Sequence, residues 1–188
     1  MIKKGNFVLT TNFDFLIEYA ILHSGIPKED IIPVITREDF EQFKDPLELL
    51  KQGKQAIYKI HGSTENIITG ESTRESLIAT IQGFGANKVG QNVFQLESFK
   101  QPAFSNLTKN RSLVVMGYSG SDDFDIVPTL KVLKQLQNVI WINHLKDGNR
   151  KAEIHEIIID KISTPKKFDK NNEKLLDIKR MNNVDHIF

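Results

Sequence analysis

The 188-residue sequence contains no cysteine, which excludes disulfides, thiolate metal sites and a cysteine nucleophile. Its five histidines are scattered, and no two lie three or four residues apart, so the pattern does not predict a histidine metal site. There are 25 lysine and arginine residues against 24 acidic ones, so the net charge of +1 predicts neither nucleic-acid nor anionic-membrane binding. No apolar run is long enough for a signal peptide or a membrane span. We therefore expect a cytoplasmic protein.

The common glycine-rich phosphate-binding motifs are also missing. The glycines of the segment 83–90 fail the G-x-G-x-x-G pattern because Lys88 stands where the last glycine should be. No Gly-Lys-Ser/Thr follows them, so the segment is not a P-loop. We interpret it as a hinge or a surface loop.

What the sequence does contain is an alternation of strand and helix patterns. Four apolar runs predict buried strands at Phe7–Leu9, Ala56–Ile60, Leu113–Met116 and Val139–Ile142. The segments between them carry helical periodicity, which is typical of an α/β fold with one mainly parallel sheet. A further short strand is expected at Ile31–Ile35, and Pro33 places it at a sheet edge.

Three helices bear on the later comparison with the structure. Leu16, Ile17, Ala20 and Ile21 recur at helical spacing and predict a helix that ends before Gly25. A small helix is expected to open at Asp45 or Pro46 and to close at Gly53. Residues 92–99 are predicted to be helical, with Pro102 after the helix.

Polar and small residues follow each predicted strand. They are Thr10–Asp14 after the first strand, His61–Ser63 after the second, Gly117–Asp122 after the third and Asn143 after the fourth. The carboxyl ends of parallel strands lie on one edge of a sheet, where open α/β proteins bind their ligands. The pattern therefore predicts a polar ligand site. Taken alone, the first cluster has a simpler interpretation, in which Thr11 or Asn12 caps the following helix.

These clusters resemble one family. Thr10–Asp14 resembles the Thr-x-Asn-x-Asp motif of the sirtuins and their bacterial relatives, and Lys59–Ser63 resembles the short strand that ends in the family's active-site His-Gly. Val115–Asp122 is similar to the Gly-Tyr/Thr-Ser element under the adenosine, and Ile142-Asn143 to the Ile-Asn at the adenine ribose. The resemblance spans residues 7–143. The Gly-Tyr-Ser…Asp-Asp variant is closest in type to the sirtuin-like domains of bacterial defence systems, which are NAD+ hydrolases.

The resemblance implies a Rossmann-like three-layer α/β fold with a mainly parallel sheet. It places a sirtuin-like domain at residues 1–162 and leaves residues 163–188 as a polar tail or a short helix. NAD+ is then the substrate, and no metal is required. The expected partner is NAD+ or an ADP-ribose-like nucleotide.

Site residues are carried over by the same resemblance. Asn12, Asp14 and His61 are assigned to catalysis. The nucleotide-binding residues are Thr10, Thr11, Gly62, Gly117, Tyr118, Ser119, Ser121, Asp122 and Asn143.

The residue types suit cleavage of the nicotinamide–ribose bond, which passes through a cationic, oxocarbenium-like sugar. Asn12 can orient the ribose or the water, and Asp14 can stabilise the cation or bind the carboxamide. His61 is the natural general base near neutral pH.

The sequence departs from the family pattern in two features, and each departure leads to a further prediction. The zinc-ribbon cysteines are absent, which argues against a protein deacylase. The family begins with a strand and a Gly-Ala-Gly loop that cradles the diphosphate, whereas only nine residues precede Thr10 here. We therefore expect a chain truncated at its N-terminus, with sheet edges left open. Such a chain is expected to turn over NAD+ slowly or not at all, and to form a homo-oligomer.

Two alternatives stay open. The first is a nucleotide- or partner-binding remnant without turnover. The second is a serine hydrolase, because Gly117–Ser121 approaches a nucleophile elbow with Ser119 as nucleophile, and Asp147 and His155 follow in the order of an α/β-hydrolase. Asp122 and Asp123 disfavour this hydrolase, since they place negative charge where an oxyanion would form.

Overall fold

A computed structural model describes residues 5–77, 96–118, 136–142 and 186–187. The chain divides into two compact units. Unit 1 contains residues 1–91 and 97–107, and unit 2 contains residues 92–96 and 108–188.

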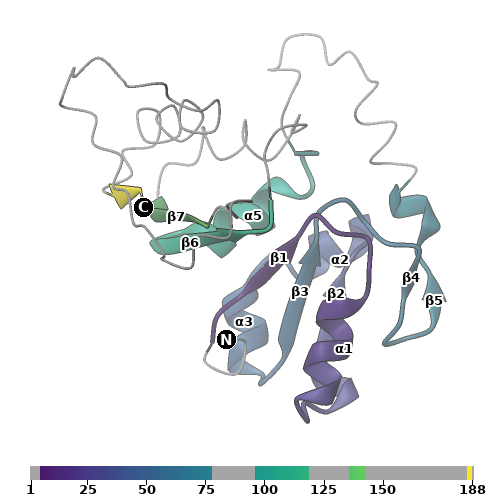
Figure 1. Cartoon of the computed structure of the whole chain (residues 1–188). Coiled ribbons are helices and arrows are strands. Elements are labelled where there is room, and N and C mark those ends of the chain that lie inside the picture. Colours follow the sequence, from purple (N-terminus) through teal and green to yellow (C-terminus); the bar gives the residue numbers. More distant parts are fainter. Residues whose placement is uncertain (1–4, 78–95, 119–135, 143–185, 188) are drawn as a thin grey trace, which may run out of the picture. The chain divides into compact units, whose positions relative to one another are not determined.

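Unit 1 is built on a three-stranded parallel sheet in the order β1-β3-β2 (Figure 1). Its strands are β1 (Val8–Thr10), β2 (Ile31–Val34) and β3 (Gln55–Lys59). Ile57 of the central strand is in register with Val8 on one side and with Pro33 on the other. Pro33 thus lies on an outer strand of this sheet, as its missing N–H predicts.

Helix α1 (Leu16–His23) covers one face of this sheet. Ile21 packs with Ile31 and Ile57 in a buried cluster. Ile17 and Ile21 of the predicted apolar face pack toward the sheet, but Leu16 is 71% exposed and Glu18 is buried in its place. The reason is an ion pair between Glu18 and the sheet, which sets the rotation of the helix.

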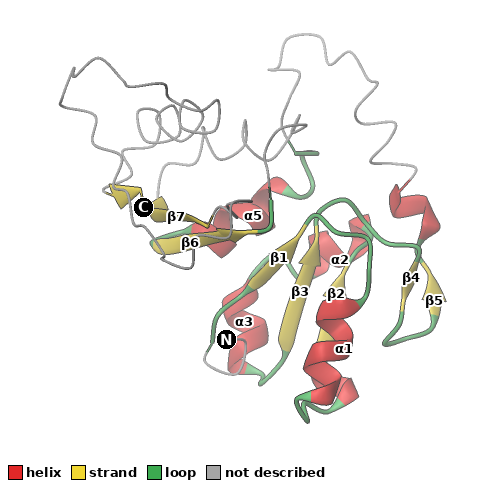
Figure 2. Ribbon diagram, viewed as in Figure 1, coloured by secondary structure: helices red, strands yellow, loops and turns green. Residues whose placement is uncertain are grey.

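The other face of the same sheet is covered by α2 (Arg37–Gln42). The rings of Phe40 and Tyr58 pack with centroids 6.1 Å apart, and the Tyr58 hydroxyl donates to the Phe43 carbonyl over 2.7 Å. Burial of this ring raises the pKa of Tyr58 well above its usual range. Helices on both faces make unit 1 a three-layer α/β arrangement, as Figure 2 shows.

The small helix at the predicted position is α3 (Pro46–Lys51), with Asp45 as its N-cap. The prediction for residues 92–99 is wrong within the described part, because residues 96–100 are not helical and α5 runs over Gln101–Thr108. Pro102 lies in the first turn of α5, where its missing N–H has no helical acceptor to lose. The remaining elements of unit 1 are a 3-10 turn at Lys28–Asp30 and an antiparallel hairpin, β4 (Glu65–Asn66) with β5 (Glu71–Ser72).

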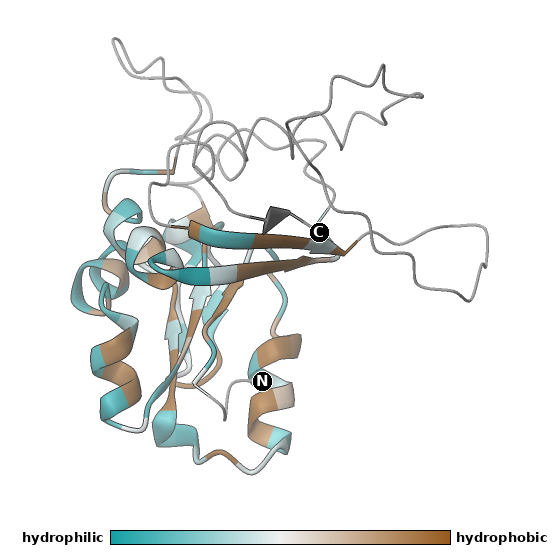
Figure 3. Ribbon diagram, turned by 90° about the vertical axis from the view of Figure 1, so that its left-hand side faces the viewer, coloured by the Kyte–Doolittle hydropathy of each residue, from teal (hydrophilic) through white to brown (hydrophobic). Residues whose placement is uncertain are grey.

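Unit 2 contains a second parallel sheet in the order β6-β7-β8. Its strands are β6 (Arg111–Met116), β7 (Leu136–Ile142) and β8 (His186–Ile187). The sequence pattern did not predict β8. Figure 3 shows apolar residues along β6 and β7. Val114, Met116 and Ile142 are substantially exposed, although their pattern is that of buried strands.

The predicted α/β class with mainly parallel pairing is confirmed. The expectation of one sheet holding all four strands is wrong for the described strands, because Val8 and Val114 belong to separate sheets and separate units. A strand joins a sheet only through backbone hydrogen bonds to a neighbour, and the described strands form two hydrogen-bonded groups, β1-β3-β2 and β6-β7-β8.

Candidate functional site

The carboxyl ends of β1 and β3 lie side by side. Thr10 is in register with Lys59, and the Ile60 amide donates to the Thr10 carbonyl over 2.9 Å. The segments Thr10–Asp14 and His61–Ser63 therefore leave the sheet at the same edge. The structure brings together two of the predicted clusters.

The first segment is a turn held by its own side chains. The Asn12 amide donates to Thr10 Oγ1 over 3.1 Å, and the Leu16 amide donates to Asp14 Oδ1 over 3.1 Å. Asp14, rather than Thr11 or Asn12, thus satisfies an amide at the start of α1. The Asn12 and Asp14 side chains are both exposed at this edge of the sheet.

His61 follows the end of β3 and is half-buried. Its ring lies 6.2 Å from the Phe13 ring, centroid to centroid, with a tilt of 35°. Phe13 is the residue between Asn12 and Asp14, so the imidazole is next to the turn that carries both side chains. The expected closeness of these two strand ends is therefore confirmed, whereas the ring contact between Phe13 and His61, 48 residues apart in sequence, was not predicted.

Gly62 occupies a position that only glycine fits. Its φ is +81°, a left-handed conformation that residues with a Cβ atom rarely adopt. A Cβ there would also collide with Ser76 Oγ and would lie 3.0 Å from the Ser76 carbonyl carbon. The close approach of Ser76 makes Gly62 part of the support for the site.

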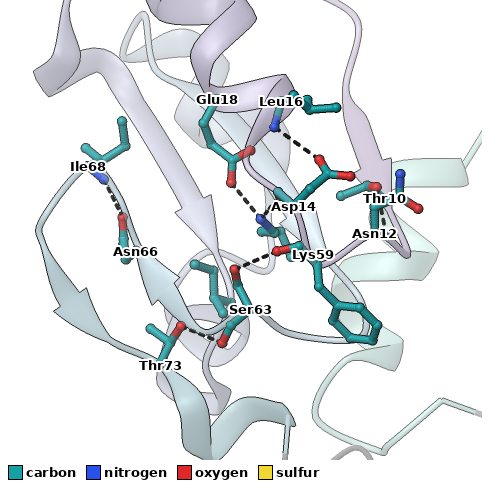
Figure 4. A network of polar contacts seen from close by, with 12 residues as sticks. Thr10, Asn12, Asp14, Leu16, Glu18, Lys59, Ser63, Asn66, Ile68 and Thr73 are labelled. Atoms are coloured by element: carbon teal, nitrogen blue, oxygen red, sulfur yellow. Dashed lines mark hydrogen bonds and ion pairs between the residues drawn. The ribbon is translucent and has the colours of Figure 1, made fainter.

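Ser63 is fully buried and hydrogen-bonds to two other segments of the chain, the Asn12 turn and residues 73–76. Its hydroxyl donates to the Phe13 carbonyl over 3.2 Å, and its amide donates to Ser76 Oγ over 3.1 Å. Its carbonyl accepts hydrogen bonds from the hydroxyls of Thr73 and Ser76. Figure 4 shows Ser63 in this network. Ser63 therefore ties the His61–Ser63 segment to the Asn12 turn.

Lys59 and Glu18 form a buried ion pair beneath the turn, 2.9 Å apart. The Lys59 ammonium also donates to the Asp14 carbonyl over 2.5 Å and lies 4.8 Å from the Phe15 ring centroid. Neither charged residue was predicted from the sequence to have a role. A signal was available in the position of Glu18 between Ile17 and Ile21, on the side of the helix expected to be apolar.

A second buried lysine, in the turn before α5, supports the end of β3. The Lys100 ammonium donates to the Ile60 carbonyl over 2.6 Å and pairs with Glu97 over 3.0 Å. It also lies over the Phe40 and Phe99 rings. The backbone just before His61 is thus held by a lysine.

The remaining predicted site residues belong to unit 2. Gly117 follows β6 with a φ of +68°, and the Tyr118 ring packs on Trp141 with centroids 5.9 Å apart. Ser119, Ser121, Asp122 and Asn143 lie outside the described residues, as do Asp147 and His155 of the hydrolase alternative.

Comparison with known proteins identifies the family. A family model for the SIR2-like domain matches residues 6–155, which is well over half of the chain. The chain therefore belongs to the SIR2-like domain family. No curated protein and no solved structure gave a significant match.

The described residues contain no cluster of three or more His, Cys, Asp or Glu residues suited to a metal ion. None of their helices combines the length and the apolar character needed to cross a membrane.

Proposed function

We propose that this SIR2-like chain binds NAD+ and hydrolyses its nicotinamide–ribose bond, with Asn12, Asp14 and His61 at the reacting sugar. One observation carries the proposal. The paired ends of β1 and β3 place an exposed amide, an exposed carboxylate and a half-buried imidazole on one edge of a parallel sheet. This is the edge at which open α/β folds bind ligands.

The reaction breaks the bond between ribose C1′ and the nicotinamide nitrogen, which keeps the electron pair and leaves as neutral nicotinamide. Water adds to C1′ and loses one proton, so the products are ADP-ribose, nicotinamide and a proton. His61 accepts that proton, and Asn12 orients the ribose or the water. One Asp14 oxygen is engaged by the Leu16 amide. The other carboxylate oxygen serves the cationic sugar or the carboxamide.

The test is chromatographic detection of nicotinamide and ADP-ribose after incubation with NAD+. We expect His61→Ala to lower turnover by about 100-fold or more, a common effect of removing a general base. His23→Ala is the matched control, because His23 lies at the end of α1 and bonds the Tyr19 carbonyl of its own helix. Measurable turnover of NAD+ by the unmodified chain that is unchanged in the His61→Ala variant would reject the catalytic assignment.

A second candidate is nucleotide binding without turnover. The observation in its favour is that Asp14 already accepts a hydrogen bond from the Leu16 amide in the turn before α1, which is a sufficient structural reason for its presence. Calorimetric titration with ADP-ribose separates the two candidates. Binding without nicotinamide release under any condition would support the second.

The family resemblance extends the proposal to a role in bacterial antiphage defence. We propose that the hydrolase depletes NAD+ during infection. Bacteria expressing the chain should then resist phage, and bacteria expressing the His61→Ala variant should not. Equal plaque numbers on both hosts would contradict this role.

A further inference from the structure

We propose that Lys59 is the positioning residue of the site, holding the segment that carries Asn12 and Asp14 against the end of β3. This inference rests on the proposed function for its activity readout, although the contacts on which it depends do not.

Within the part of the chain that the structure describes, the contacts of the Lys59 ammonium go to one short segment. An ammonium has three N–H donors, and here they face the Glu18 carboxylate, the Asp14 carbonyl and the Phe15 ring. These three residues lie within residues 14–18, and Asp14 is two residues after Asn12. Lys59 thereby links β3 to the entire turn leading into α1, as Figure 4 shows for Glu18 and Asp14.

Lys59 also lies in the right place to relate the turn to His61. Lys59 is the last residue of β3, and His61 lies in the turn that directly follows this strand, beside Phe13. The lysine therefore holds the Asn12 turn against the strand end from which the segment of the imidazole continues.

Stability alone is a weak reason for this ion pair. The Lys59 and Glu18 side chains are 0% and 2% exposed, so both charges are desolvated. Glu18 Oε2 is buried and has no hydrogen-bond partner among the described residues. An apolar pair of similar volume is often as stable as a buried ion pair or more so. A positioning role explains why the charged pair is present.

The experiment compares three variants by thermal unfolding, by amide hydrogen exchange of residues 12–16 without ligand, and by NAD+ kinetics. Lys59→Met leaves Glu18 as an unpaired buried charge. The melting temperature and kcat/KM should therefore fall, and amide exchange in residues 12–16 should become faster. The double variant Glu18→Leu with Lys59→Met should recover the melting temperature. It should keep fast exchange in residues 12–16 and a kcat/KM lowered by about 10- to 100-fold, since small misplacements cost that much.

The matched control is Lys54→Met. Lys54 makes the same kind of contacts at the opposite end of β3, to the Asp30 carboxylate and the Glu29 carbonyl. Its replacement should lower the melting temperature while leaving exchange in residues 12–16 and kcat/KM unchanged. An effect of Lys54→Met on that segment equal to the effect of Lys59→Met would overturn the proposal.

The outcomes separate the two proposals. A double variant that regains both slow exchange and full kcat/KM would show that Lys59 is only structural. If the unmodified chain neither binds NAD+ nor releases nicotinamide, the proposed function fails. Exchange in residues 12–16 still decides the positioning role in that case.

Discussion

At the scale of the residue, Gly62 combines two independent constraints. Its left-handed φ would strain any side chain, and Ser76 occupies the space that a Cβ would need. Gly70 shares only the first constraint, because its φ is +80° and no atom lies within 4 Å of a built Cβ. Comparing alanine substitutions at the two glycines therefore separates the cost of backbone strain from the cost of the collision with Ser76.

We predict that Gly62→Ala lowers the free energy of unfolding by about 1–3 kcal/mol more than Gly70→Ala does, because the clash adds to the strain. It should also weaken NAD+ binding, because Gly62 adjoins His61. Urea unfolding and calorimetry measure the two effects. Equal losses in both variants would show that Ser76 moves aside without cost.

At the scale of the element, the start of α1 depends on a residue that the proposed chemistry also uses. Asp14 accepts a hydrogen bond from the Leu16 amide through one oxygen. Replacement by asparagine keeps an oxygen acceptor and removes the charge, whereas replacement by alanine removes both. The pair of variants separates capping from catalysis.

We predict that Asp14→Asn changes stability by less than about 0.5 kcal/mol, since the asparagine side-chain oxygen can accept the same hydrogen bond from the Leu16 amide. Turnover of NAD+ should nevertheless fall by about 100-fold, because the stabilising charge is lost. Asp14→Ala should show the same fall together with a stability loss of about 1 kcal/mol.

The control for these variants is Asp45→Asn, which makes the same change at the start of α3, where Asp45 accepts from the Leu47 amide. It should leave turnover unaffected. Full activity of the Asp14→Asn variant would restrict Asp14 to capping.

At the scale of the whole molecule, both parallel sheets end in a strand with one partner. Among the described strands β1 pairs only with β3, and β6 pairs only with β7. Strand edges of this kind invite pairing with a further strand. Val114, Met116 and Ile142 add exposed apolar surface in the second sheet.

We predict that the chain forms a homo-oligomer in solution, because self-association would cover such edges and apolar side chains. Sedimentation velocity over a range of protein concentrations measures the association. A single monomeric species at every concentration would contradict the prediction. Alanine at Met116, which is 58% exposed, should weaken association if the second sheet is the interface.

Much of the element content was predictable because it depends on local pattern. The apolar runs at Val8–Thr10 and Gln55–Lys59 are strands within a residue or two of the predicted bounds. The helix at residues 37–42 was missed, although Thr36 and Asp39 form a capping box that the sequence displays. Pro102 was interpreted as the residue after a helix, whereas a proline is equally suited to a first turn.

The polar strand ends were visible in the sequence, because residues that follow an apolar run lie at the end of a strand whatever the rest of the chain does. The neighbours of those ends were not visible. Glu18 and Lys59 are 41 residues apart, and Ser63 reaches a carbonyl 50 residues away. Such contacts depend on which strands pair and on how a helix is rotated on the sheet. Local sequence pattern therefore specified the chemical groups of the site, and only long-range packing determined which buried residues hold them in place.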